Sequence, residues 1–286
     1  MRLCPILEEA KGSRKRGREI EDSKAWGIEF DGKMASMIQK GHSRKVQGRT
    51  VFHLDRVFDE DTQTSLVYKS IARPMIPAVL NGKHATIFAY GQTGSGKTYT
   101  MQGGEKVETG QAGIIQLVAT DLFLSIGSEK ASRRKFEIKV SYFEIYNEKI
   151  RDLLDDDGEN SSTDSSTHRR DPINVRTNER GEVVVNVLQK KVNNADEALA
   201  ILVQGNAHRT VAATDVNAHS SRSHSVFRLT VESRSSTDKE QVIDNKIGGV
   251  VRVSDFNLVD LAGSESLKAT KTTGIRQREG ATINKR

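Results

Sequence analysis

The sequence predicts an α/β fold in which a central mixed sheet is flanked by helices. Segments with helical and strand-like apolar patterns alternate along most of the 286 residues, and such alternation is typical of this class. One short apolar segment, residues 85–90, runs directly into a glycine-rich turn that is followed by a helix start. The chain is long enough for a substantial core, in one large domain or two small ones.

The predicted elements follow from the period of the apolar residues and from the turn residues between them. Strands are expected at 49–55, 85–90, 136–146, 226–231 and 250–259, with one or two more within 173–188; the strands at 226–231 and 250–259 are expected to be neighbours. Helices are expected from 59–62 to Leu80, from Gly96 to Met101, over 114–126 and over 195–205. Pro74 and Pro77 predict a kink or break in the first helix.

Three segments are expected to lie outside regular structure. Residues 1–48 show no clear pattern, so they are separated as a poorly defined region from a core at 49–286. Residues 102–113 are polar and glycine-rich, which favours a surface loop. Residues 155–167 are acidic and rich in serine, a composition typical of disorder.

The bulk composition favours a soluble, intracellular protein located in the cytoplasm. Cys4 is the single cysteine, which excludes a disulfide framework, and the sequence shows no signal peptide or membrane-spanning run. The net charge of +6 and the pI near 9.3 favour an acidic partner. Aromatic residues are few and no nucleic-acid-binding signature is present, so nucleic acid is not expected as that partner.

The glycine-rich turn has the pattern of a phosphate-binding loop, Gly-x-x-x-x-Gly-Lys-Thr, between a strand and a helix. Its glycines let backbone N–H groups turn toward a phosphate chain, and the helix start adds its positive end. Lys97 supplies a cation for the outer phosphates, and the Thr98 hydroxyl is placed to ligate Mg²⁺. The residues expected to bind the phosphates of a nucleoside triphosphate are Gly91, Gln92, Thr93, Gly94, Ser95, Gly96, Lys97 and Thr98.

Two further segments complete the predicted site. Residues 217–224, Asn-Ala-His-Ser-Ser-Arg-Ser-His, gather small donors that can reach phosphate oxygens, Mg²⁺ or a water molecule, although an ordinary polar turn has the same composition. Residues 257–265 form an apolar strand that ends in Asp260, and a carboxylate at that position holds Mg²⁺. Gly263, three residues later, lets a backbone N–H approach the γ-phosphate.

Together these motifs resemble the kinesin motor domain. The residues that carry the resemblance are GQTGSGKTYTM at 91–101, NAHSSRSH at 217–224 and DLAGSE at 260–265, supported by FHLDRVF at 52–58, ATIFAYG at 85–91, SYFEIYNEKIRDLL at 141–154 and EGATINK at 279–285. The resemblance implies a three-layer phosphate-loop NTPase fold and ATP hydrolysis with Mg²⁺. It also implies binding to microtubules, force production and a location on the cytoskeleton.

The resemblance also implies roles for single residues. Tyr99 and Pro5 would contact the adenine, and Asn217, Ser220 and Ser221 would form the first switch, with Ser221 joining Thr98 and Asp260 on Mg²⁺. Arg222 would pair with Glu265 of the second switch and order the waters used in hydrolysis. The catalytic set implied in this way is Lys97, Ser220, Ser221, Arg222, Gly263 and Glu265. The loop that follows is basic through Lys268, Lys271, Arg276 and Arg278, and such a loop would suit the acidic microtubule surface, although a solvated loop is the alternative.

The chain departs from the family pattern at both ends. Cys4 stands where the family has the second arginine of its first strand, which affects the adenine contacts on that side. Arg286 is the last residue, where the relay helix of the family has only begun. The resemblance therefore predicts an incomplete motor domain, from a fragment or an incomplete gene model, that is marginally stable and cannot walk. Elements that determine oligomeric state would lie outside the chain.

Two other classes of protein remain as alternatives. The first is a non-motile module that binds microtubules under nucleotide control, which ATP turnover would distinguish from a motor. The second is another phosphate-loop enzyme, a GTPase or a helicase. The guanine-reading Asn-Lys-x-Asp motif is absent and the first switch is rich in serine, so both members of the second class are disfavoured.

Overall fold

The structure is a computed structural model that describes residues 26–30, 35–39, 51–104, 111–128, 134–155, 173–179, 181, 183–211, 222–235, 242–243, 246–247 and 251–264. The chain forms two compact units, Met1–Val67 and Tyr68–Arg286.

The first unit contains a three-stranded antiparallel sheet in the order β1 (Trp26–Phe30), β2 (Ala35–Gln39), β3 (Val51–Leu54). β3 confirms the strand expected at 49–55. The other two strands lie in the region 1–48, where the sequence showed no pattern. Both strands have only five residues, which is too short for a clear alternation of apolar residues in the sequence, and they are identified by their pairing with neighbouring strands.

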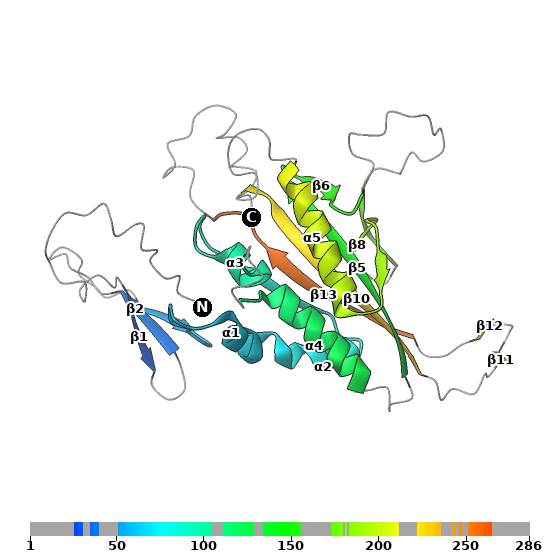
Figure 1. The fold of residues 1–286 in the computed structure, drawn as a ribbon, viewed down its shortest axis with the longest axis horizontal. Helices are drawn as coiled ribbons and strands as arrows, with labels where there is room; N and C mark the ends of the chain where they lie inside the picture. The colour runs from blue at the N-terminus through cyan, green and yellow to red at the C-terminus, as the bar shows by residue number, and fades with distance from the viewer. Residues whose placement is uncertain are drawn as a thin grey trace, which may run out of the picture. The chain divides into compact units, whose positions relative to one another are not determined.

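The second unit contains a six-stranded mixed sheet. Its strands are β4 (Ala85–Ala89), β13 (Val251–Asp260), β10 (His224–Ser235), β5 (Arg134–Tyr146) and β6 (Lys149–Asp152) in that order, with β9 (Lys190–Val192) also paired to β5. β13 runs parallel to β4 and antiparallel to β10, which confirms the expected neighbouring strands near the end of the chain (Figure 1). The sequence pattern did not predict β6 and β9, which have only four and three residues.

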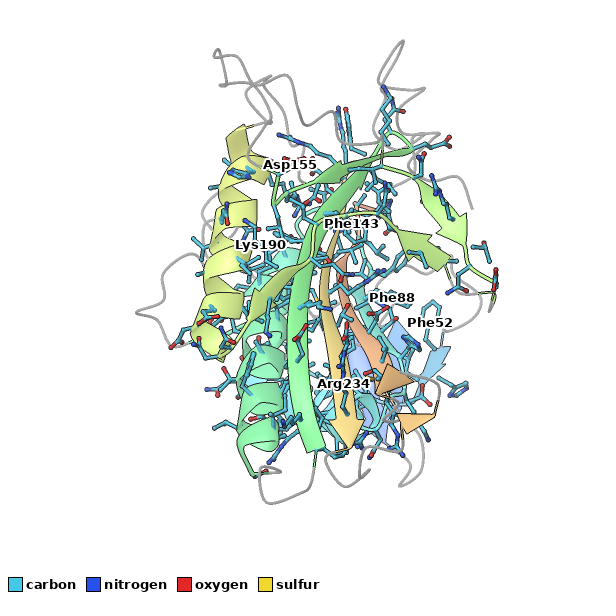
Figure 2. All side chains as sticks on the ribbon, turned by 90° about the vertical axis from the view of Figure 1, so that its right-hand side faces the viewer. Phe52, Phe88, Phe143, Asp155, Lys190 and Arg234 are labelled. Atoms are coloured by element: carbon cyan, nitrogen blue, oxygen red, sulfur yellow. The ribbon has the colours of Figure 1, made fainter. Side chains whose placement is uncertain are left out.

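Helices cover one face of this sheet. α4 (Ile114–Ser128) and α5 (Ala195–Val211) lie side by side on it, as Figures 1 and 2 show from two directions. Beneath them the strand register aligns apolar side chains in rows, and one row joins Tyr142, Phe227 and Leu258 across three strands. All three side chains are almost completely buried. This alternation of buried and outward residues is the pattern that predicted the strands.

The helix expected to end at Leu80 is broken, as its two prolines predicted. α1 (Thr64–Ile71) is followed by a 3₁₀ turn (Arg73–Met75) and by α2 (Ile76–Leu80). The helix begins at Thr64, later than the expected start at 59–62, where Thr62 instead donates a hydrogen bond to the Asp59 carboxylate.

The other expected elements are present with small differences. α3 (Lys97–Gln102) follows the glycine-rich turn, and β7 (Val175–Thr177) and β8 (Val183–Val185) form a separate hairpin within 173–188. A second small sheet pairs β11 (Val242–Ile243) with β12 (Lys246–Ile247). Most of the acidic, serine-rich segment lies outside the described residues. Among the described helices, none is both long and apolar enough to cross a membrane.

α5 continues to Val211, well beyond the expected end at Gly205. The last turns of α5 are polar and show no helical spacing of apolar residues, so the helix end predicted from the sequence was too early. Tertiary contacts hold these turns in place: the Nδ1 atom of His208 lies 2.9 Å from the Leu153 carbonyl oxygen, and Asn206 and Arg209 also bond to the sheet.

Candidate functional site

The glycine-rich turn lies between β4 and α3 and is shaped by backbone conformations that favour glycine. Gly94 and Gly96 have φ values of 77° and 81°, in the left-handed region. A side chain at Gly91 would bring a Cβ within 2.6 Å of the Ser95 Oγ atom. The turn is therefore closely packed, and glycine suits these positions.

The end of β13 lies beside this turn because β13 runs parallel to β4. Asp260 pairs with Ala89, the last residue of β4, so both strands end at the same edge of the sheet. The Thr98 Oγ1 atom donates a 2.6 Å hydrogen bond to Asp260 Oδ2. Beyond the strand, the backbone N–H of Ser264 donates to the Gly91 carbonyl at 3.1 Å. The turn and the segment after β13 thus form one site.

The Lys97 ammonium group is held inside the turn. Its Nζ atom donates to the carbonyl oxygens of Gly91 and Gln92 at 2.9 and 3.0 Å. The lysine thus places a cation beside the glycine-rich turn. That arrangement suits the negative charge of a phosphate chain.

A row of polar side chains ends the sheet on its helix-covered face. The strand register places Glu144, Ser225 and Asp260 side by side on β5, β10 and β13. All three are buried. Glu144 Oε1 also lies 3.8 Å from the guanidinium of Arg151, which is on β6.

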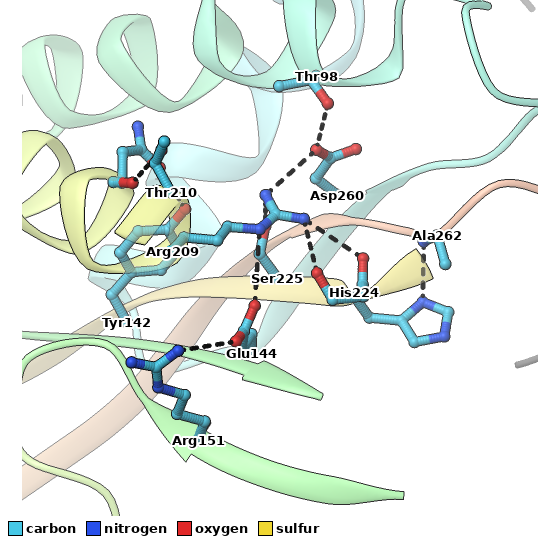
Figure 3. A network of polar contacts seen from close by, with 12 residues as sticks. Thr98, Tyr142, Glu144, Arg151, Arg209, Thr210, His224, Ser225, Asp260 and Ala262 are labelled. Atoms are coloured by element: carbon cyan, nitrogen blue, oxygen red, sulfur yellow. Dashed lines mark hydrogen bonds and ion pairs between the residues drawn. The ribbon is translucent and has the colours of Figure 1, made fainter. Parts of the chain in front are cut away.

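Arg209, on the last turns of α5, lies over this row (Figure 3). Its guanidinium is 3.7 Å from Glu144 Oε2 and 3.9 Å from Asp260 Oδ2, and it donates to Ser225 Oγ at 3.3 Å. It also donates to the carbonyl oxygen and the hydroxyl of Ser223, at 3.3 and 3.0 Å. One buried cation therefore joins three strands and the end of the polar segment 217–224.

The charges around Asp260 act in opposite directions on its pKa. Burial raises the pKa of this carboxyl above its ordinary value, while the Thr98 hydrogen bond and the nearby Arg209 and Lys97 lower it. Burial is the largest cause, so the pKa is raised overall. Asp260 Oδ1 is buried without a hydrogen-bond partner among the described residues. A buried carboxylate oxygen of this kind is the donor that a hard cation takes.

His224 supports the backbone after Asp260. Its Nδ1 atom accepts a 3.1 Å hydrogen bond from the backbone N–H of Ala262. Burial lowers the pKa of His224, and Arg209 lowers it further, although Asp260 opposes them. The neutral ring, protonated on Nε2, therefore fixes the peptide group between Leu261 and Ala262, close to Gly263.

The structure brings several of the predicted residues together. The phosphate-loop residues and Asp260 lie in one site, and Gly263 lies three residues after Asp260, in the segment that bonds to Gly91. Tyr99 is partly exposed at the start of α3, and Arg222 is described next to Ser223. The predicted residues that lie outside the described part of the chain are Pro5, Asn217, Ser220, Ser221 and Glu265, together with the basic residues Lys268, Lys271, Arg276 and Arg278.

The sequence indicated no role for Arg209 or Glu144, and it gave none to His224 beyond its place in the segment 217–224. Glu144 stands at a buried position of the strand pattern, between Phe143 and Ile145, and a charge at such a position needs a partner. That signal could have identified Glu144. Arg209 lies in a polar stretch and gave no comparable signal.

Comparisons with known proteins agree with this geometry. The sequence model of the family described as kinesin motor domain matches residues 5–286. The chain is 40% identical over 231 residues to the chloroplastic Kinesin-like protein KIN-7L of Arabidopsis thaliana, covering 81% of this chain and 21% of that protein. It is 39% identical over 242 residues to Centromere-associated protein E of Homo sapiens, covering 84% of this chain and 8% of that protein. The chain thus spans about a fifth or less of the length of these curated relatives.

Solved structures show the same fold. A fast kinesin aligns with a TM-score of 0.75 and 31% identity, over 99% of this chain and 70% of that chain. A KIF14 dimer in its two-heads-bound state, with AMP-PNP and in complex with a microtubule, aligns with a TM-score of 0.74 and 30% identity, over 99% of this chain and 72% of that chain. The mixed sheet with its covering helices is therefore the fold of these kinesin structures.

Proposed function

Because this chain belongs to the kinesin motor domain family, we propose that it is the ATP-hydrolysing part of a microtubule motor. Kinesin motor domains bind nucleotides and associate with microtubules of the cytoskeleton. The observation that carries the proposal is the hydrogen bond from Thr98 to Asp260, because it joins the phosphate loop to the end of β13 beside Lys97. The proposed activity is ATP hydrolysis coupled to microtubule binding and movement.

The phosphate loop holds the nucleotide in this proposal. Its backbone N–H groups, from Gly91 to Thr98, surround the phosphate chain. Lys97 exchanges its two carbonyl partners for phosphate oxygens, which carry more negative charge. Tyr99 contacts the adenine from the partly exposed start of α3, and the family pattern assigns an adenine contact to Pro5 as well.

The donor set also fits Mg²⁺. Thr98, Ser221 and Asp260 supply oxygen atoms, which Mg²⁺ prefers, and the unpartnered Asp260 Oδ1 is available for this role. When bound, Mg²⁺ neutralises charge on the phosphates and so favours phosphoryl transfer. Arg209 and Thr98 hold the Asp260 carboxylate in place beside the loop.

The two switches position the reacting water. Asn217, Ser220 and Ser221 face the phosphates from the first switch, and Arg222 pairs with Glu265 of the second. Gly263 offers its backbone N–H to the γ-phosphate, and His224 fixes the preceding peptide through Ala262. No strong base is required, because phosphoryl transfer depends mainly on positioning and charge neutralisation.

The partner in this proposal is the microtubule, and the site of action is the cytoplasm. The basic residues Lys268, Lys271, Arg276 and Arg278 follow the second switch, so a change at Gly263 reaches them through a short segment. Their charge complements an acidic surface.

The test is steady-state ATP hydrolysis by the chain with and without microtubules, beside Lys97→Ala. We expect microtubules to raise the rate and Lys97→Ala to abolish it, because the variant loses its phosphate-binding cation. Lys149→Ala, at an exposed lysine of β6, is the matched control and should keep the rate. An ATP hydrolysis rate that microtubules do not change would contradict the proposed motor function. It would indicate a nucleotide site that does not respond to microtubule binding. If the folded protein does not hydrolyse ATP, the proposal that this chain is an enzyme is wrong.

A further inference from the structure

A closed ring of three hydrogen bonds joins α3, β5 and α5. The Tyr142 hydroxyl donates to Asn206 Oδ1 at 2.7 Å, and Asn206 Nδ2 donates to Gln102 Oε1 at 3.0 Å. Gln102 Nε2 donates to the Tyr142 oxygen at 3.3 Å and so closes the ring. Each side chain donates once and accepts once, and hydrogen bonds arranged in this way strengthen one another.

The ring is built into the core. Tyr142 is completely buried, and its ring packs edge-on against Phe227 with centroids 5.6 Å apart. Gly205 lets α5 approach closely, because a Cβ there would lie 2.2 Å from the Tyr142 ring. The tyrosine is therefore fixed, and α3 and α5 are fixed to it.

The same two helices meet again one turn away, at Asp260. Thr98 lies four residues before Gln102 on α3, and it donates to Asp260 Oδ2. Arg209 lies three residues after Asn206 on α5, and its guanidinium approaches the same oxygen at 3.9 Å. Residues at these spacings share one face of a helix.

β5 also contacts α5 at two neighbouring points, one in the ring and one beside Asp260. Tyr142 and Glu144 lie two residues apart, on the same face of the strand. Tyr142 contacts Asn206, and Glu144 contacts Arg209 at 3.7 Å. The Tyr142–Asn206 and Glu144–Arg209 contacts therefore set the position of α5 along β5. Of the two, only the Tyr142–Asn206 contact belongs to the ring, which also includes Gln102 on the helix of the phosphate loop.

From this geometry we infer that Gln102, Tyr142 and Asn206 are positioning residues for ATP hydrolysis. The ring sets the position of α5 relative to α3, and hence the position of the Arg209 guanidinium against the Asp260 carboxylate. Among the described residues, the three hydrogen bonds of the ring include no residue of the phosphate loop, 91–98, and do not include Asp260. Its loss therefore lowers kcat while the KM for ATP stays nearly unchanged. This inference rests on the proposed ATP hydrolysis.

The test measures kcat and KM at saturating microtubules for Tyr142→Phe, Asn206→Leu and Gln102→Met. Rates are expressed per folded molecule, with the folded fraction taken from circular dichroism. We expect kcat to fall about three- to tenfold, as when one buried hydrogen bond is lost from the transition state, and KM to stay within about twofold. Gln102→Met, at a partly exposed position, and Tyr142→Phe, which keeps the ring, serve if Asn206→Leu does not fold.

Gln204→Leu is the matched control. It removes an amide on the same helix that accepts a 3.2 Å hydrogen bond from Lys190 of β9, away from the ring. We expect this variant to keep its kcat. If it loses as much as Asn206→Leu, any loosening of α5 is sufficient and the ring has no special role.

A double variant tests whether the ring acts through Arg209. The kcat of Asn206→Leu combined with Arg209→Lys should be close to that of Arg209→Lys alone, because the two changes disturb one interaction. Multiplicative losses, or ring variants with the wild-type kcat, would overturn the inference and leave the proposed function standing. A wild-type chain without ATP turnover would overturn both.

Discussion

Thr98 and Asp260 are 162 residues apart in the chain, and the hydroxyl of the first donates a 2.6 Å hydrogen bond to the carboxylate of the second. The bond joins the helix after the phosphate loop to the end of β13. Arg209 approaches the same carboxylate oxygen from α5, at 3.9 Å. The carboxylate thus connects α3, α5 and β13.

Asp260→Asn should stabilise the nucleotide-free protein at neutral pH. Burial raises the pKa of Asp260, so the folded chain binds a proton more readily than the unfolded chain, and stability falls as pH rises above the ordinary pKa. Asparagine has no charge to bury and can still accept the Thr98 hydrogen bond. We expect a higher Tm than wild type at neutral pH, with the difference shrinking as the carboxyl becomes protonated in acid. A lower Tm at neutral pH would show that the attraction of Arg209 and Lys97 outweighs burial.

Arg209→Met should destabilise the fold strongly. It leaves Glu144 and Asp260 buried without their shared cation, and removing one partner of a buried ion pair costs about 3–5 kcal/mol. The measurement is the free energy of unfolding in urea.

The control for that experiment is Arg151→Met, because Arg151 lies 3.8 Å from the same Glu144 but is 45% exposed. An exposed ion pair contributes about 1 kcal/mol or less, so this variant should be close to wild type. Equal losses in the two variants would contradict the importance of the buried cation.

Gly205→Ala should destabilise the protein, although alanine normally favours a helix. The new Cβ would lie 2.2 Å from the Tyr142 ring, which is completely buried and cannot move aside. Overpacking of this kind costs about 1–3 kcal/mol in the free energy of unfolding. Gly127→Ala on α4 is the control, because nothing lies within 4 Å of its Cβ, and it should be neutral or stabilising. A Gly205→Ala protein as stable as Gly127→Ala would show that α5 is not in close contact with Tyr142.

His224 should make stability depend on pH near neutrality. Burial lowers its pKa in the folded chain, so as pH falls the unfolded chain takes up a proton first, near the ordinary pKa of about 6.5. Stability is lost through that window and levels off below the lowered pKa. We expect the advantage of wild type over His224→Gln in the free energy of unfolding to shrink between about pH 7.5 and about pH 5.5. A constant advantage would mean that the folded ring accepts the proton as readily as the unfolded one, and a growing advantage that it accepts the proton more readily.

Local sequence patterns were sufficient to predict the phosphate loop and Asp260. The other residues of the site are brought together by the pairing register of distant strands. The loop could be predicted because Gly96, Lys97 and Thr98 are contiguous with a strand and a helix. Glu144 and Ser225 could not be placed beside Asp260 from the sequence, because their alignment depends on the register of three strands. Arg209 lies in helical turns that have no apolar period, and the contacts that hold those turns against the sheet cannot be seen in the sequence.

The most direct test of the account compares ATP turnover by wild type and Asp260→Asn over a microtubule titration. We predict that the wild-type rate rises with microtubule concentration to a plateau. The variant should remain about 100-fold lower or more at every concentration, because it lacks the charged oxygen that the site provides. Both proteins should pellet with microtubules, which shows that binding is retained. Equal rates in the two proteins, or a wild-type rate that microtubules do not raise, would contradict the assignment of this site as the centre of a microtubule-stimulated ATPase.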